Sequence, residues 1–136
     1  MLAALPDWFG DPGAVDRYAA FAESEEATVL AARGDDETLG MVTLRVHAAT
    51  QCQVHSLGVF ARSQARRGPG PRRGRRCSGA GASSAYLGVK ALAETAPDPN
   101  HAGTRASDSA MGFRPYERLD TPWGPCSPCL LTLRPL

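Results

Sequence analysis

The sequence has no long apolar run and almost no lysine. None of its hydrophobic stretches reaches the roughly 18 residues that a membrane-spanning helix needs, so we expect no membrane partner. Of its 15 basic residues only Lys90 is a lysine. Because the formal net charge is +1, the chain as a whole has no general attraction for nucleic acid or for an anionic surface.

The sequence also lacks a secretion signal and a disulfide pattern. Residues 1–8 contain no basic region of the kind that opens a signal peptide. The cysteines, Cys52, Cys77, Cys126 and Cys129, have spacings that suggest no disulfide framework. The Cys126-x-x-Cys129 pair has no second pair of ligands for zinc, and it precedes a strand instead of opening a helix as a redox motif does. We therefore expect a cytoplasmic protein with reduced thiols, no bound metal, and Cys129 in the core.

A chain of 136 residues is expected to form one domain, spanning residues 1–136, around a single hydrophobic core. The spacing of apolar residues predicts helices and strands in a definite order. Helices are expected at 12–24 and from about 100 to 111, and strands at 27–33, 39–47, 51–60, 86–92, 113–119 and 129–133. This order predicts an α+β fold with a mixed, mostly antiparallel sheet flanked by helices.

Residues 71–84 are atypical within this domain. They contain no Leu, Ile, Val, Phe or Met, and seven of the chain's arginines lie between Arg62 and Arg76. Gly74, Gly79 and Gly81 would each cost about 1 kcal/mol in the interior of a helix. We therefore predict a flexible Arg/Gly-rich loop where the rest of the order calls for a helix.

Motifs along nearly the whole chain outside 71–84 resemble, in order and spacing, the small bacterial members of the GNAT superfamily of N-acetyltransferases. Each motif is weak alone, and their order carries the resemblance. The motifs are Leu5–Gly10, Gly58-Val59, the Arg-Arg-Gly-Pro-Gly loop at 66–70, Tyr86–Lys90, Asp98–Asn100, Thr104–Ala106, Ala110–Pro115, Trp123–Pro125 and Pro128–Leu130. The resemblance implies an acyl-CoA N-acyltransferase fold and an enzyme that transfers an acetyl group from acetyl-CoA to an amine.

The resemblance also implies where acetyl-CoA binds. Backbone N–H groups at the end of the strand would contact the thioester and the pantetheine, at Gly58, Val59 and Phe60. A glycine-bearing loop with arginines suits a pyrophosphate, and it is expected at Arg66, Arg67, Gly68 and Gly70. Pro69 removes one N–H from this loop. Asn100 is expected either to contact the pantetheine or to cap the helix that it begins, and capping is the simpler interpretation.

Three residues are candidates for the chemistry. His55 lies on the strand that leads into Gly58-Val59 and could accept the proton of the amine, or it could be a hydrogen-bonded histidine of the sheet. Asp108 occupies the position where the family usually has a tyrosine that protonates the leaving thiolate. An ionised aspartate cannot donate a proton unless burial raises its pKa far above 3.9. Tyr116 is a possible substitute for that tyrosine.

The acceptor is expected to be a small molecule or a peptide with a free amine, and an exposed sheet edge could pair two copies into a homodimer. Two alternatives come from another class of protein. One is a degenerate domain that binds CoA or a partner without turnover. The other is a nucleic-acid binder that uses the arginines of 62–76, although this segment has no aromatic residue on which a base could stack.

Overall fold

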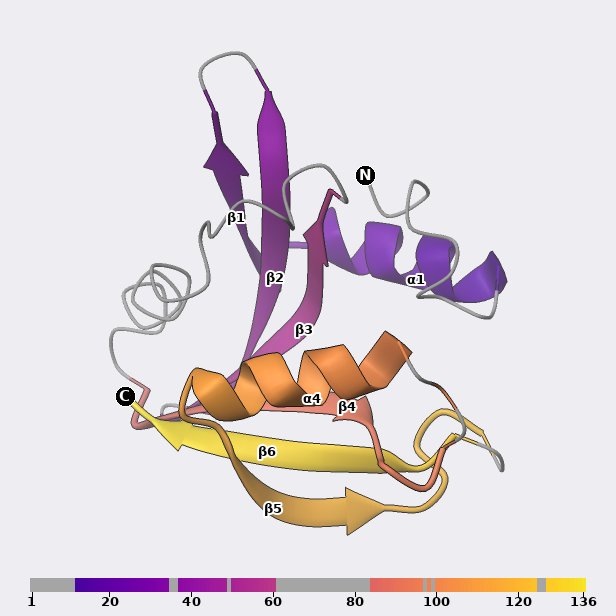
Figure 1. The fold of residues 1–136 in the computed structure, drawn as a ribbon. Coiled ribbons are helices and arrows are strands. Elements are labelled where there is room, and N and C mark those ends of the chain that lie inside the picture. The colour runs from indigo at the N-terminus through magenta and orange to yellow at the C-terminus, as the bar shows by residue number, and fades with distance from the viewer. Residues whose placement is uncertain are drawn as a thin grey trace.

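The computed structural model describes residues 12–34, 37–48, 50–60, 84–96, 98, 100–124 and 127–136. These residues form two helices and one six-stranded sheet (Figure 1). In chain order the elements are α1 (Pro12–Ala22), β1 (Ala27–Arg33), β2 (Thr38–Ala48), β3 (Gln51–Val59), β4 (Tyr86–Leu92), α4 (Asn100–Ala110), β5 (Arg114–Leu119) and β6 (Cys129–Pro135). The predicted α+β fold with a mixed, mostly antiparallel sheet is confirmed. The predicted loop at 71–84 lies outside the described residues.

The sheet divides into two halves between β3 and β4. The strand order is β1-β2-β3-β4-β6-β5, and only the β3–β4 pair is parallel. This parallel pairing runs from Gln51–Tyr86 to Val54–Val89 and then ends, although β3 continues beside β2 and β4 continues beside β6. Figure 1 shows the result, because β1, β2 and β3 stand upright whereas β4, β6 and β5 run across the view.

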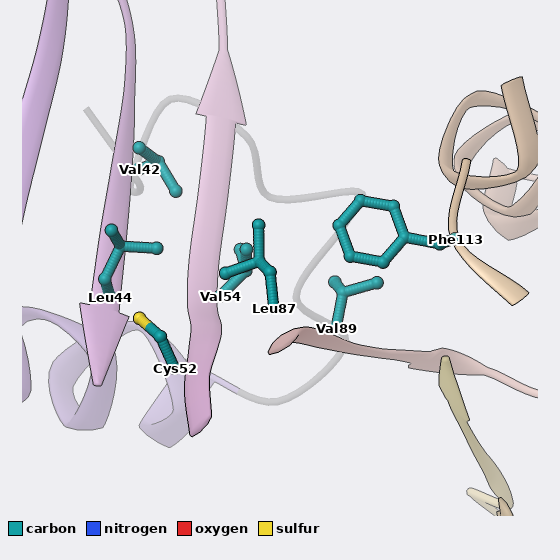
Figure 2. Close-up of a cluster of buried hydrophobic side chains, with 7 residues drawn as sticks. All are labelled: Val42, Leu44, Cys52, Val54, Leu87, Val89 and Phe113. Atoms are coloured by element: carbon teal, nitrogen blue, oxygen red, sulfur yellow. The ribbon is translucent and has the colours of Figure 1, made fainter. Parts of the chain in front are cut away.

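The main hydrophobic core lies on one face of the sheet, at the point where the two halves separate. Phe113, which follows α4, packs against residues of both halves (Figure 2). Gly112 ends α4 with a φ of 90°, as the sequence predicts, and this left-handed residue turns the chain toward Phe113. The cluster includes the last residue pair that joins β3 to β4. Its members are Val42, Leu44, Cys52, Val54, Leu87, Val89 and Phe113.

The two helices cover opposite faces of the sheet. Leu87 and Val89 face Phe113, so strand alternation points Lys90 to the other face. On that other face Phe21 of α1 lies against His55, with 4.0 Å between the ring centroids. Cys129 is completely buried, which confirms that it is a core residue. Neither described helix has the length and apolar character needed to cross a membrane.

Two buried hydroxyl groups fix the register of β2 against β3. Thr43 and Ser56 are paired across the two strands, both are buried, and their hydroxyl oxygens lie 2.6 Å apart. A hydroxyl in a dry site that loses its only partner costs about 1–3 kcal/mol. A shift of β3 by one residue would separate these two groups, so the pair holds β3 in register next to the irregularity that carries His55.

Candidate active site

His55 is the extra residue of a β-bulge. The antiparallel register pairs Thr43 with Ser56 and Leu44 with Val54, so His55 lies between two paired positions and has no partner on β2. Bulges occur often beside active sites, because the extra residue bends the strand and changes the direction of a side chain. The bulge also lies next to Val54, which is the last residue of β3 that pairs with β4.

The imidazole of His55 is held between two aromatic side chains of α1. Its ring centroid is 4.0 Å from that of Phe21 and 5.3 Å from that of Tyr18, in tilted and edge-to-face arrangements. Burial lowers the pKa of His55 below its usual 6.5, and the positive charges of Arg45, His47 and Lys90 lower it further. The side chain is therefore mostly neutral at pH 7, and a neutral imidazole is the form that accepts a proton.

At the end of β3, every second backbone N–H group points toward the side where β4 no longer pairs with this strand. The N–H of Phe60 donates to the carbonyl of Leu39 at 3.1 Å, so it points toward β2 and is already used. Because successive N–H groups of a strand point to opposite sides, those of Val59 and Leu57 point toward the side from which β4 has departed. The Leu57 N–H therefore has the direction that the sequence analysis expected of Phe60.

Gly58 is buried between Leu57 and Val59, and its backbone leaves no room for a side chain at position 40 of the neighbouring strand β2. A Cβ on Gly40 of β2 would lie 2.8 Å from the carbonyl oxygen of Gly58, which is closer than real side chains approach. Glycine at position 40 therefore allows β2 to lie close beside the end of β3. This contact fixes the backbone that presents Leu57 and Val59.

Asp108 lies on the side of α4 that faces the protein interior. Its side chain is buried, whereas its neighbours Ser107 and Ser109 are exposed. The Oδ2 atom is inaccessible to solvent and has no hydrogen-bond partner among the described residues. Desolvation by burial raises the pKa of Asp108 to about 6. The backbone N–H of Phe113 donates to the carbonyl of Asp108 at 3.1 Å, which places this residue next to the core where the sheet divides.

Tyr116 does not lie with His55 or Asp108. It is the irregular position of β5, at the outer edge of the sheet, and its side chain is 69% exposed. Strands β4 and β6 separate it from β3. The position of Tyr116 therefore gives no support to the prediction that it replaces the family's tyrosine, whereas Asp108 has the burial and the raised pKa that proton donation requires.

The other predicted ligands of acetyl-CoA are only partly covered by the structure. Asn100 is the first residue of α4, as the sequence predicts. The predicted pyrophosphate loop lies outside the described residues, and its members are Arg66, Arg67, Gly68 and Gly70. Their roles remain predictions from the sequence.

Sequence reasoning missed the bulge at His55 and the cation beside it. The guanidinium carbon of Arg45 lies 4.3 Å from the ring centroid of Phe21, so Arg45, Phe21 and His55 are in successive contact. Gln53 pairs with Arg45 in the register, and its Oε1 lies 2.6 Å from the Nε2 atom of His47. Alternation along β2 and β3 could have placed Arg45 and Gln53 on one face, but no sequence signal marks the extra residue that forms the bulge.

The chain has the fold of the GNAT acetyltransferases, as comparison with solved structures shows. The aminoglycoside 6'-N-acetyltransferase from Enterococcus faecium superposes with a TM-score of 0.69 at 16% identity, over 98% of this chain and 89% of that one. A GNAT family acetyltransferase from Elizabethkingia anophelis, solved with acetyl-CoA bound, gives a TM-score of 0.69 at 14% identity, over 97% and 88% of the two chains.

A third protein with this fold is an enzyme that is named for a protein substrate. The ribosomal-protein-S18-alanine N-acetyltransferase from Escherichia coli has a TM-score of 0.66 at 12% identity, over 88% of this chain and 76% of that one. No protein-family model matches the sequence, and no curated protein is significantly similar to it in sequence. At these identities the likeness establishes the fold, and the activity has to be argued from the site.

Proposed function

We propose that the protein is an acetyl-CoA-dependent N-acetyltransferase that acts on an amine. The observation that carries this proposal is the end of the β3–β4 pairing at Val54–Val89, with a bulged and neutral histidine at that point. A strand that continues without its neighbour offers backbone N–H groups to a ligand that enters the gap. The proposal is supported by the fold, because a protein with the same fold has been solved with acetyl-CoA bound.

The residues of this chain fit the thioester of acetyl-CoA, which supplies an activated acetyl group. The N–H group of Leu57 would hold the thioester carbonyl. A fixed donor at this position stabilises the negative charge that develops on the carbonyl oxygen. The adjoining core around Val54 and Val89 lies where the β3–β4 pairing ends.

Two side chains on opposite faces of the sheet would move the protons. The nitrogen of the acceptor forms a bond to the acetyl carbon while the carbon–sulfur bond breaks and its electron pair stays on sulfur. His55 takes the proton of the amine on the α1 face, and Asp108 gives its carboxyl proton to the thiolate from the α4 face. With a pKa of about 6, roughly a tenth of the Asp108 side chains carry this proton at pH 7.

Calorimetric titration with acetyl-CoA tests the binding half of this proposal. We expect binding in the micromolar range, and a ligand concentration of about 100 times Kd should raise the free energy of unfolding by about 2.7 kcal/mol. The double variant Arg66→Gln/Arg67→Gln should bind at least about tenfold more weakly, because charge-assisted hydrogen bonds contribute about 1.5–3 kcal/mol each.

The matched control for this titration removes two arginines of the same basic stretch outside the predicted loop. Arg72→Gln/Arg73→Gln should leave the affinity for acetyl-CoA within about twofold of the parent protein, since the resemblance assigns no ligand contact to these arginines and charges without a contact are screened. Equal losses in the two double variants would show a general electrostatic attraction instead of a pyrophosphate site. A folded protein that does not bind acetyl-CoA would contradict the proposed function.

The competing candidate is a domain that binds CoA without turnover. The observation in its favour is Asp108, which stands where the family usually has a tyrosine and which is mostly ionised at neutral pH. Release of CoA thiol in the presence of an amine distinguishes the two functions. A protein that binds acetyl-CoA but releases thiol no faster with any amine than without one would be such a binding domain.

A further inference from the structure

The face of the sheet that carries His55 is cationic. Arg45 lies in successive contact with Phe21 and His55, through a guanidinium carbon 4.3 Å from the ring centroid of Phe21. Lys90 projects from β4 to the same face, directly after the β3–β4 pairing ends at Val89. The charges of Arg45 and Lys90 both reach His55, because both lower its pKa. Two permanent cations therefore share this face of the sheet with the candidate base.

These two cations are poorly neutralised by the residues that the structure describes. Lys90 forms no ion pair with any described residue, and the ion pair of Arg45 is a long one, 3.5 Å to Glu26, whose side chain is 73% exposed. The Nε atom of Arg45 is buried and has no hydrogen-bond partner within the described part of the chain. A buried donor without an acceptor is costly unless a ligand supplies one.

No described carboxylate balances the charge at His55 itself. The acidic residues on α1 and in the turn after it, Asp16, Glu23, Glu25 and Glu26, are exposed, and no carboxylate is among the charges that shift the pKa of His55. Opposite Arg45 the strand carries Gln53, which is neutral and already lies within hydrogen-bond distance of His47. The local field therefore favours a negatively charged group and opposes an additional positive one.

We infer that the acceptor is a small primary amine that also carries an anionic group, a carboxylate or a phosphate, which Arg45 and Lys90 bind while His55 takes the amine proton. This inference rests on the proposed function, because it assumes that the acceptor approaches on the His55 face. It separates this chain from enzymes for polycationic acceptors, although one protein with the same fold is an aminoglycoside 6'-N-acetyltransferase. An acceptor with several ammonium groups would be repelled by both cations.

A matched series of acceptors tests the inference. The α-amides of glutamic acid, glutamine and lysine present the same amine beside a negative, a neutral and a positive side chain. Glucosamine 6-phosphate and glucosamine make the corresponding pair for a phosphate, so the two arms distinguish the two sources of negative charge. In one of the two arms, we expect kcat/KM to be at least about tenfold higher for the anionic acceptor than for its neutral counterpart. The lysine amide should have a lower kcat/KM than the glutamine amide.

Variants connect this preference to the two cations. Arg45→Gln and Lys90→Gln should each reduce the ratio between anionic and neutral acceptors to below about threefold, mainly through KM of the anionic acceptor. Arg33→Gln makes the same substitution at an exposed arginine at the end of β1, and it should leave the ratio unchanged. Equal or faster turnover of the neutral and cationic amines by the parent protein would overturn the inference and leave acetyl transfer intact.

A second readout separates failure of the inference from failure of the proposed function. The ring protons of His55, followed by NMR, should report an upward change in its pKa when glutamic acid α-amide or glucosamine 6-phosphate binds, and none with the neutral counterparts. This response without any turnover would support the anion site and contradict the proposed acetyl transfer. No turnover together with no response of His55 would overturn both.

Discussion

Replacing His55 with glutamine is expected to reduce kcat for acetyl transfer about a hundredfold or more while leaving the affinity for acetyl-CoA within about twofold. General base catalysis contributes about 10²–10⁴ to a rate, and glutamine keeps the polarity and size of the side chain without its basic nitrogen. Acetyl-CoA is bound through the backbone of β3 in this account, so its Kd should not change. Thiol release under saturating acetyl-CoA, together with calorimetry, measures both quantities.

Two further variants separate catalysis from packing at this position. His55→Phe keeps an aromatic ring between Tyr18 and Phe21 and should be equally inactive in a folded protein. His47→Gln changes an exposed histidine of β2 and keeps a donor for Gln53, so its kcat should stay within about twofold of the parent. A His55→Gln variant that retains most of the parent's kcat would show that His55 is a packing residue of the sheet.

The pH profile of the parent protein provides a signature that packing alone does not produce. The pKa of His55 lies below 6.5 because the residue is buried and faces Arg45, His47 and Lys90. The decrease of kcat/KM on the acid side of the profile should therefore occur below pH 6.5, where the imidazole becomes protonated. Arg45→Gln removes one of the charges that lower this pKa, so the same decrease should move to higher pH.

Replacing Asp108 with asparagine is expected to stabilise the protein by about 2–3 kcal/mol at pH 8. The pKa of Asp108 is raised from 3.8 to about 6 in the folded protein, because the charged form is buried without hydrogen bonds to Oδ2. A difference of one pKa unit corresponds to about 1.4 kcal/mol between the protonation states. Asparagine has nearly the same shape and never acquires the charge, so it avoids this cost.

The sign of the pH dependence follows from proton binding. Between pH 4 and 6 the folded state binds more protons than the unfolded state, so the parent protein loses stability as pH rises through this range. The gain in Asp108→Asn should thus be small at pH 4 and reach its full size above pH 7, as measured by urea unfolding. Asp120→Asn, at a carboxylate that is 83% exposed, should show no such gain. A gain that is the same at both pH values would contradict the buried-carboxylate explanation.

Asp108→Asn should also lose activity while it gains stability. Without a carboxyl proton, the thiolate must take its proton from water, and we expect kcat to fall about tenfold or more. Opposite changes in stability and activity are typical of a group whose unfavourable burial serves a function. A variant that is more stable and fully active would remove Asp108 from the proposed mechanism.

The fold could be predicted from the sequence because each described element has a local signal. The β-branched Val54 and Val59, which favour extended backbone, predicted β3, and the left-handed Gly112 ended α4 where its position suggested. The order of helices and strands then left few arrangements open. The same reasoning placed His55 on the correct strand, next to the residues that the resemblance assigned to acetyl-CoA.

The geometry of the site could not be predicted in this way, because it depends on tertiary contacts. Nothing in the sequence marks His55 as the extra residue of a bulge, since the bulge is set by the pairing of β3 with β2. The raised pKa of Asp108 follows from its burial on the inner side of α4, and the cationic neighbourhood of His55 joins residues of β2 and β4. Phe60 was predicted to bind the ligand, but its N–H bonds to Leu39, and that contact also requires the folded sheet.

The measurement that tests the central claim most directly is an amide NMR titration of the protein with acetyl-CoA. We expect the N–H resonance of Leu57 to change most among those of the described strands, because this group points toward the side of β3 from which β4 has departed. Residues of β1, at the far edge, should change little. Saturable binding that leaves the resonance of Leu57 unchanged would contradict the claim that the active site lies where β3 and β4 separate.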